Sequence, residues 1–133
     1  MIKYIGNPRN LFVARMVAWE GVAGWRDVAP LDPRLSIVNH SPTGFAWGYW
    51  GSGPAQLSFA LIADALVSSI EEKHPELRAS VLTRARNPAL YQTFKQQVVG
   101  TWPREEPFEI TDSQVLHDVE EIERELAARA VQS

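Results

Sequence analysis

The chain has 133 residues, 45% hydrophobic and 22% charged, with a formal net charge of −3, a composition that suits one compact domain over residues 1–133. It contains no cysteine, which excludes disulfides and cysteine-based zinc sites, and its three histidines lack metal-ligand spacing. We therefore expect no cofactor and no metal. No signal peptide is recognisable, and the apolar run over residues 57–67 is too short to span a bilayer and contains Asp64, so we expect a soluble cytoplasmic protein without a membrane partner.

Strands and loops are expected in the first part of the chain. Alternating apolar residues predict strands at residues 2–5 and 11–17, although the second stretch also fits the spacing of a short helix. Residues 20–34 carry two glycines and two prolines and predict a loop. Residues 35–39 and 45–49 flank a five-residue turn that contains a proline and a glycine, which predicts an antiparallel hairpin.

Helices are expected from Pro54 onward. Residues 54–73 leave almost no polar face over the first three turns, which predicts a buried central helix. A shorter helix is predicted for residues 75–86, and Asn87 before Pro88 is typical of the start of another helix, which runs to Val99. Residues 108–110 are expected to add an edge strand.

The C-terminal segment predicts an acidic amphipathic helix over residues 111–131. Thr111 and Gln114 have the spacing of a capping box at its start. Its apolar stripe is expected to bury either on the domain itself or on a second copy, and we favour a homodimer; the stripe consists of Val115, Val119, Ile122 and Leu126. Together the elements predict an α+β fold, with three or four mostly antiparallel strands packed against three or four helices.

A glycine-rich corner before the central helix is the main candidate ligand site. Gly53 is the expected N-cap and Gln56 is expected to reach back to it, so that unpaired N–H groups and the positive end of the helix dipole face any bound anion. The aromatic residues before the corner share one face of the predicted strand and either pack in the core or wall the site. The corner is either only a tight connection or a binding site, whose candidate residues are Tyr49, Trp50, Gly51, Ser52, Gly53 and Gln56.

Known nucleotide and hydrolase motifs are incomplete in this corner. A P-loop requires a lysine directly after the glycines, and the next lysine here is Lys73. The dinucleotide fingerprint requires a glycine where Gln56 stands, and Ser52 lacks the flanking glycines of a nucleophile elbow. The corner itself contains no basic residue, so a phosphate ligand would require an arginine from elsewhere in the fold, with Arg15, Arg84 and Arg86 as candidates.

One long motif spans the corner: His40-Ser41-Pro42-x-Gly44-Phe45-x-Trp47-Gly48-Tyr49-x-Gly51-Ser52-Gly53-Pro54-Ala55-Gln56-Leu57, with the later Tyr91-Gln92-x-Phe94-Lys95. Through it, residues 35–110 resemble a family of uncharacterised proteins, domain of unknown function 6166, which occurs in bacteria, archaea, phages and plasmids. The resemblance implies no activity, because the family has no assigned one. Trp50 stands where the family favours a small residue, often glycine, which is expected to change access to the corner.

Charge is distributed unevenly along the chain. Residues 1–103 contain 10 basic and 7 acidic residues, a net charge of +3, whereas residues 104–133 contain 3 basic and 9 acidic residues, a net charge of −6. The acidic helix is either a solvated face or a surface for a basic partner, with Glu120, Glu121, Glu123 and Glu125 as candidate partner-binding residues. The basic residues are dispersed, so we expect no nucleic-acid partner.

Asp64 is unusual because it lies in an otherwise apolar helix. It is expected either on the only wet stripe of that helix or in an ion pair with an arginine such as Arg15. A nucleophilic triad of Ser52, Asp64 and His74 is not expected, since Asp64 and His74 would lie about 15 Å apart along one helix.

Three functions remain open from the sequence. The first, which we favour, is a small non-enzymatic accessory protein of a phage or mobile element that binds a host or defence-system protein. The second is a binding module for a phosphate-bearing small molecule or nucleotide at the corner. The third is a hydrolase that uses Ser52 or Asp64 in an unfamiliar pattern. No catalytic residue is assigned.

Overall fold

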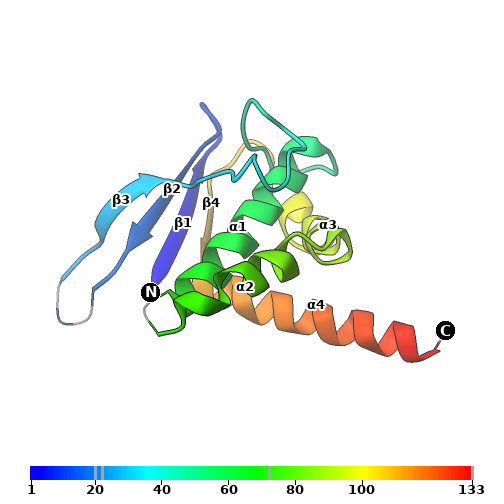
Figure 1. Cartoon of the computed structure of the whole chain (residues 1–133). Coiled ribbons are helices and arrows are strands. Elements are labelled where there is room, and N and C mark those ends of the chain that lie inside the picture. Colours follow the sequence, from blue (N-terminus) through cyan, green and yellow to red (C-terminus); the bar gives the residue numbers. More distant parts are fainter. Residues whose placement is uncertain (20, 22, 72, 133) are drawn as a thin grey trace.

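A four-stranded antiparallel sheet forms one layer of the molecule, and four α-helices lie on one side of it (Figure 1). The computed structural model describes residues 1–19, 21, 23–71 and 73–132. The spatial order of the strands is β3-β2-β1-β4. Their bounds are β1 Ile2–Asn7, β2 Phe12–Val17, β3 Arg26–Pro30 and β4 Phe108–Thr111. The α+β fold predicted from the sequence is therefore confirmed.

The two central strands form a hairpin whose inner face belongs to the core. β1 pairs with β2 from Ile2 opposite Val17 to Asn7 opposite Phe12, and every second residue of β1 is buried. This alternation is the pattern expected for a sheet with one covered face. The residues before Val17 therefore form a strand and not the alternative short helix.

One loop prediction and two strand predictions were wrong. Residues 26–30, which were expected in a loop, form β3, whose five residues are all exposed at the edge of the sheet. Glu20 and Val22, which belong to that predicted loop, lie outside the described residues. Residues 35–39 and 45–49 form no strand. In the second stretch, Gly48 has a φ of +84° and its N–H donates to the carbonyl of Val99, so the chain turns away from any neighbouring strand.

Helix α1, Ser52–Ile70, is the centre of the core. Every residue from Gly53 to Val67 is buried, and α1 contacts the other three α-helices. By length and composition alone α1 could cross a membrane, with a mean hydropathy of 1.3 over its most apolar window, but 83% of that window is buried inside the domain. This burial is the pattern of the core helix of a soluble protein. The predicted central helix, residues 54–73, is thus confirmed, with its end three residues earlier than expected.

The remaining helices begin near the predicted signals. Asn87 caps helix α3, because its side chain accepts a hydrogen bond from the N–H of Ala89. The predicted helix over residues 75–86 is a 3₁₀ turn followed by a short α-helix. The bounds of these elements are η1 Pro75–Leu77, α2 Arg78–Ala85, α3 Pro88–Gln97 and η2 Val99–Thr101.

Helix α4, Asp112–Gln132, runs under α2 and α3 and extends past the rest of the domain (Figure 1). The Thr111 hydroxyl accepts the N–H of Gln114, as the capping box predicts, whereas the Gln114 side chain donates to Asp118 instead of returning to the cap. Val115, Val119 and Ile122 are buried in the core of the same chain, and Leu126 packs against it. Of the two fates considered for this stripe, burial on the domain itself is the observed one, and self-association stays a prediction.

Candidate functional site

The glycine-rich corner lies at the N-terminal end of α1. Gly51 is the N-cap, with φ −126° and ψ −168°, and its carbonyl accepts the N–H of Ala55. The expectation that Gly53 would be the cap was wrong. Helix α1 begins at Ser52, so Gly53 and Pro54 lie inside its first turn. Proline is tolerated there because the N–H that it lacks would have no partner within the helix. The N-cap Gly51 has no side chain, and among the described residues no side-chain cap bond is found at the start of α1.

Both glycines of the corner are required by packing. A side chain at Gly51 would meet the ring of Tyr49, and a Cβ at Gly53 would lie 2.7 Å from the Cβ of Ala46. Both contacts would be closer than the van der Waals distance between two carbon atoms. Gly51 and Gly53 therefore let the chain fold tightly against its own side chains, as in the structural interpretation of the corner.

Gln56 does not orient the corner, contrary to the sequence prediction. Its side chain is completely buried and faces the preceding irregular segment, residues 33–41. Its Oε1 accepts the N–H groups of His40 and Ser41 at 2.7 and 3.3 Å. Its Nε2 donates to the carbonyls of Pro33 and Val38 at 2.7 and 2.8 Å. The Gln56 amide thus supplies the hydrogen bonds that a neighbouring strand would otherwise give to this segment, and it holds the segment against α1.

An open cavity of about 280 Å³ remains beside the start of α1. Tyr49, Ser52 and Gly53 line it, whereas Trp50, Gly51 and Gln56 do not. Further lining residues come from the turn before the corner and from the β1–β2 connection: Asn10, Leu11, Ser41, Thr43, Gly44, Phe45 and Ala46. Three residues with aliphatic hydroxyls, Ser41, Thr43 and Ser52, and the phenol Tyr49 therefore line a space next to the first turn of α1. None of the predicted arginines lines this cavity.

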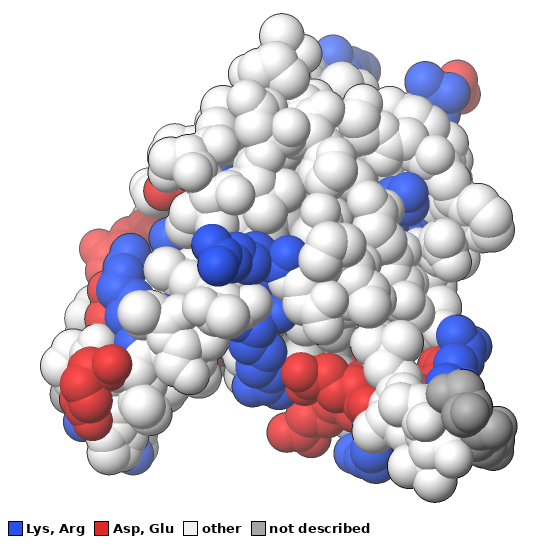
Figure 2. Space-filling model, turned by 45° about the vertical axis from the view of Figure 1, so that its right-hand side comes forward, with Lys and Arg blue, Asp and Glu red and all other residues white. Residues whose placement is uncertain are grey.

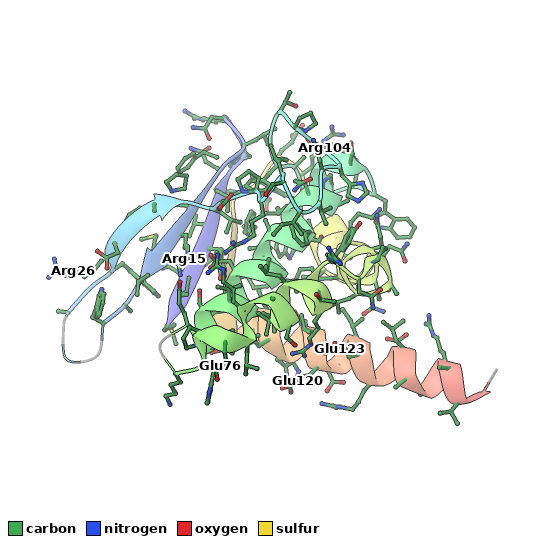
Figure 3. All side chains as sticks on the ribbon, viewed as in Figure 1. Arg15, Arg26, Glu76, Arg104, Glu120 and Glu123 are labelled. Carbon is green, nitrogen blue, oxygen red and sulfur yellow. The ribbon has the colours of Figure 1, made fainter. Side chains whose placement is uncertain are left out.

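An aromatic patch, which we define as Tyr49, Trp50 and Arg104, lies on the surface of the same corner. The Arg104 guanidinium carbon is 4.5 Å from the centre of the Tyr49 ring, a cation–π distance. Trp50 packs one edge against Gly100, where a Cβ would lie 2.8 Å from the indole Nε1, yet 66% of the residue is exposed. Figure 3 shows Arg104 at the end of the molecule that carries the corner. Phe45 and Trp47, in contrast, are buried in the core.

A contact between His40 and Tyr91 was not predicted from the sequence. His40 Nε2 lies 2.6 Å from the Tyr91 hydroxyl, and Tyr91 packs edge-on against Phe59 of α1. Burial raises the pKa of the Tyr91 phenol. The one sequence signal for this contact was that His40 and Tyr91 belong to the two parts of the family motif. The motif gives no information on whether these two parts are in contact in the fold. The contact connects the segment held by Gln56 to α3.

The family model for DUF6166, a family of unknown function, matches residues 15–87. This match covers more than half of the chain. The chain belongs to the DUF6166 family. The matched region of this DUF6166 protein begins in β2 and ends at the cap of α3, so it contains the corner, Gln56 and all of α1. Neither the curated proteins nor the solved structures compared with the chain include a match.

A buried polar network lies in the second half of α1. Asp64 accepts the Tyr4 hydroxyl at 2.6 Å and the Arg15 Nε at 2.8 Å, which confirms the predicted pairing with Arg15. Arg34 Nη2 lies 3.8 Å from the other carboxylate oxygen, and Arg15 also donates to the Ser68 hydroxyl at 3.0 Å. Burial and the charge of Asp64 raise the pKa of Tyr4 far above its ordinary value, so the phenol stays protonated and donates.

This network does not resemble a hydrolase site. Ser52 and Asp64 lie on one helix, about 18 Å apart at 1.5 Å per residue, so they cannot act on one bond. Within the described residues, no group of three or more His, Asp or Glu side chains could hold a metal ion. The network joins sheet to helix, and its chemistry is that of a hydrogen-bonded ion pair.

Most of the candidate glutamates of α4 already have partners in this chain. Glu123 binds Arg84 of α2 through two nitrogens, Glu121 pairs with Arg124 and Glu125 pairs with Arg129. Figure 3 shows Glu120 and Glu123 beside α2. Glu120 forms no ion pair with any described residue. The acidic surface is therefore partly neutralised, and Arg84 is committed to α4 instead of the corner.

Proposed function

We propose that this DUF6166 protein is a non-enzymatic binding protein whose partner is another protein. The observation that carries the proposal is the aromatic patch, because 66% of Trp50 is exposed while its edge is held against Gly100. Tryptophan, tyrosine and arginine are the residues enriched at the energetic centres of protein interfaces. In the setting proposed from the sequence, the protein acts in the cytoplasm as an accessory factor of a phage or mobile element and binds a host or defence-system component.

The rigidity of the patch supports this function. The Tyr49 ring has the Arg104 guanidinium over it and occupies the space that a side chain at Gly51 would need, so it loses little freedom when a partner binds. The upper half of the face in Figure 2 carries few charged side chains, whereas blue and red atoms gather on its lower half. A partner of matching chemistry offers an apolar pocket for Trp50 and a carboxylate for Arg104.

Affinity capture tests the proposal with two matched tryptophan variants. The tagged protein, Trp50→Ala and Trp19→Ala are each incubated with a lysate of the cell that carries the gene, and retained proteins are identified by mass spectrometry. Trp19 is a fair control because 53% of it is exposed and it lies next to β2, away from the corner.

The captured partner is then purified and titrated by calorimetry. We expect Trp50→Ala to weaken binding by about 30-fold or more, the effect of losing one hot-spot residue of about 2 kcal/mol, and Trp19→Ala to leave it unchanged. Equal affinity of wild type and Trp50→Ala for every retained protein contradicts the proposal. An enzymatic activity that survives Trp50→Ala would also contradict it.

A second candidate function is the binding of a phosphate-bearing small molecule or nucleotide in the 280 Å³ corner cavity. Its support is the group of three hydroxyls, Ser41, Thr43 and Ser52, beside helix N–H groups without a side-chain cap. Calorimetry with inorganic phosphate, cyclic nucleotides and AMP tests it. Ser52→Ala and Thr43→Ala are the proper variants, because Gly53→Val would disturb the packing against Ala46. Absence of binding to the wild type, or unchanged affinity in both variants, refutes this site.

A further inference from the structure

A second cavity lies at the opposite end of α1, beside Met1 and Ile2 at the start of the chain. Its volume is about 350 Å³, large enough for a small organic molecule. The end of β2, the last turn of α1 and its continuation form the walls, with Arg15, Val17, Trp19, Ser68, Glu71 and Lys73 among the lining residues. About 28 Å of helix separates this cavity from the corner, since α1 has 19 residues.

Arg15 is the fixed cation of this cavity. Its Nε donates to Asp64 and its Nη2 donates to the Ser68 hydroxyl, so two side chains of α1 hold the planar guanidinium in one orientation. These two bonds use only part of its five N–H donors. Figure 3 shows Arg15 between the strands and α1. A guanidinium that is held from behind and lines an open space presents its remaining donors to a ligand.

The charge of the buried network also points to an anion. Asp64 is one carboxylate, but two guanidinium groups, those of Arg15 and Arg34, share it. The buried Nε of Arg34 has no hydrogen-bond partner among the described residues. The network therefore has one positive charge more than it has negative charges, and a ligand anion on Arg15 would balance it.

The acidic residues of the cavity wall have partners of their own. Asp112 accepts the N–H groups of Ile2 and Ser113 at 3.1 and 2.9 Å. Glu71 lies 3.6 Å from Arg78 of α2. Lys73 adds a second basic residue to the wall. Among its described residues, the cavity wall thus carries the cations Arg15 and Lys73, while Asp112 and Glu71 have contacts of their own and the charge of Glu71 also acts on Arg15.

Trp19 supplies an aromatic wall. Its indole Nε1 donates to Asp27 of β3 at 3.0 Å, which sets the orientation of the ring, and 53% of the residue is exposed. An indole held by its N–H offers its face for stacking on a planar group. We propose that this cavity binds a small aromatic anion, with the planar ring against Trp19 and the anionic group at Arg15.

Two probes with this shared chemistry test the proposal, benzoate as an aromatic carboxylate and AMP as an aromatic phosphate. Their uncharged counterparts, benzamide and adenosine, measure the contribution of the negative charge. Binding to the full chain is followed by calorimetry, and by the NMR shifts of the Trp19 indole and of the Ser68 and Ser69 amides. We expect saturable binding of at least one anionic probe and at least about tenfold weaker binding of its uncharged counterpart.

Three variants separate this site from the corner. Trp19→Ala, on the surface, and Arg15→Lys, which keeps a cation opposite Asp64, are each expected to weaken the bound probe about tenfold or more, because stacking and the guanidinium fork are lost. Ser52→Ala in the corner is expected to leave its affinity unchanged. No saturable binding of either probe, equal binding of charged and uncharged forms, or loss of binding in Ser52→Ala overturns the proposal. Each of these outcomes leaves the capture experiment with Trp50 unaffected.

Discussion

The two ends of helix α1 are built on different physical principles. At the N-terminal end, glycines are pressed against Tyr49 and Ala46, and the buried Gln56 amide is fully used by backbone groups. At the C-terminal half, a carboxylate and two guanidinium groups meet and leave donors next to an open cavity. The N-terminal end, which carries the long motif, is thus held mainly by packing, whereas the half that contains Asp64 has the unbalanced charge. In this chain, the residues of the long motif serve the close packing of the backbone more than they indicate a ligand site.

The largest expected effect concerns the charged end. Asp64→Ala leaves Arg15 and Arg34 without their shared carboxylate, and we expect the free energy of unfolding to fall by about 3–5 kcal/mol. Urea denaturation measures this loss. Glu121→Ala, which breaks an exposed ion pair with Arg124, is the matched control and should cost less than about 1 kcal/mol. Equal losses for the two variants would remove the distinction between the ends.

The second prediction concerns Gln56. Gln56→Met keeps the size of the side chain but removes hydrogen bonds to four backbone groups, so we expect a loss of about 2–3 kcal/mol in the free energy of unfolding. Hydrogen exchange at the amides of His40 and Ser41 should become faster at the same time. If these two amides remain protected in Gln56→Met, the segment is held by other contacts.

The third prediction tests the packing of the corner. In Gly53→Ala the new methyl group meets the Cβ of Ala46, and we expect a loss of about 1–3 kcal/mol from overpacking. The double variant Gly53→Ala with Ala46→Gly should recover part of this loss. Thermal denaturation of the wild type, the two single variants Gly53→Ala and Ala46→Gly, and the double variant gives the coupling between the sites. A stable Gly53→Ala single variant would show that the corner is looser than its geometry indicates.

The smallest effect compares two serines at the two ends. Ser68→Ala removes the hydroxyl that accepts a hydrogen bond from Arg15, and we expect a loss of about 0.5–1.5 kcal/mol. Ser52→Ala, at an exposed position with no cap bond, should stay within about 0.5 kcal/mol of the wild type. Chemical denaturation at one pH measures both. A larger stability loss in Ser52→Ala than in Ser68→Ala would show that the hydroxyl in the corner, and not the one bound to Arg15, stabilises the fold.

Local signals in the sequence predicted the helices but not the full sheet. Asn87 and Thr111 cap their helices because capping needs only neighbours in the chain. Strand β3 has no alternation to recognise, because all five of its residues are exposed. Residues 45–49 do alternate, with Phe45 and Trp47 buried, but no strand lies beside them. Burial alternation alone therefore predicted a strand where no ladder exists.

The candidate site was only half predictable for a related reason. Tyr49, Ser52 and Gly53 line the corner cavity, as expected from residues that are close in sequence. The contacts that decide the chemistry join distant segments, such as Arg104 over Tyr49. Pairing of Asp64 with Arg15 was predicted from the cost of burying a lone carboxylate, which depends on no neighbour in the chain. The sequence predicted the pairing that follows from a general energetic rule. It did not predict the contact between Arg104 and Tyr49, which depends on how distant segments meet in the fold.

The place of β1 in the sheet also has a consequence for biosynthesis. β1 has β2 on one side and β4 on the other, and Ile2 donates its N–H to Asp112, which is 110 residues further along the chain. While the ribosome is still making the intervening segments, β1 has only its hairpin neighbour and presents an open edge. The sheet is therefore completed late in synthesis, and until β4 is made this edge of β1 has unpaired N–H and C=O groups.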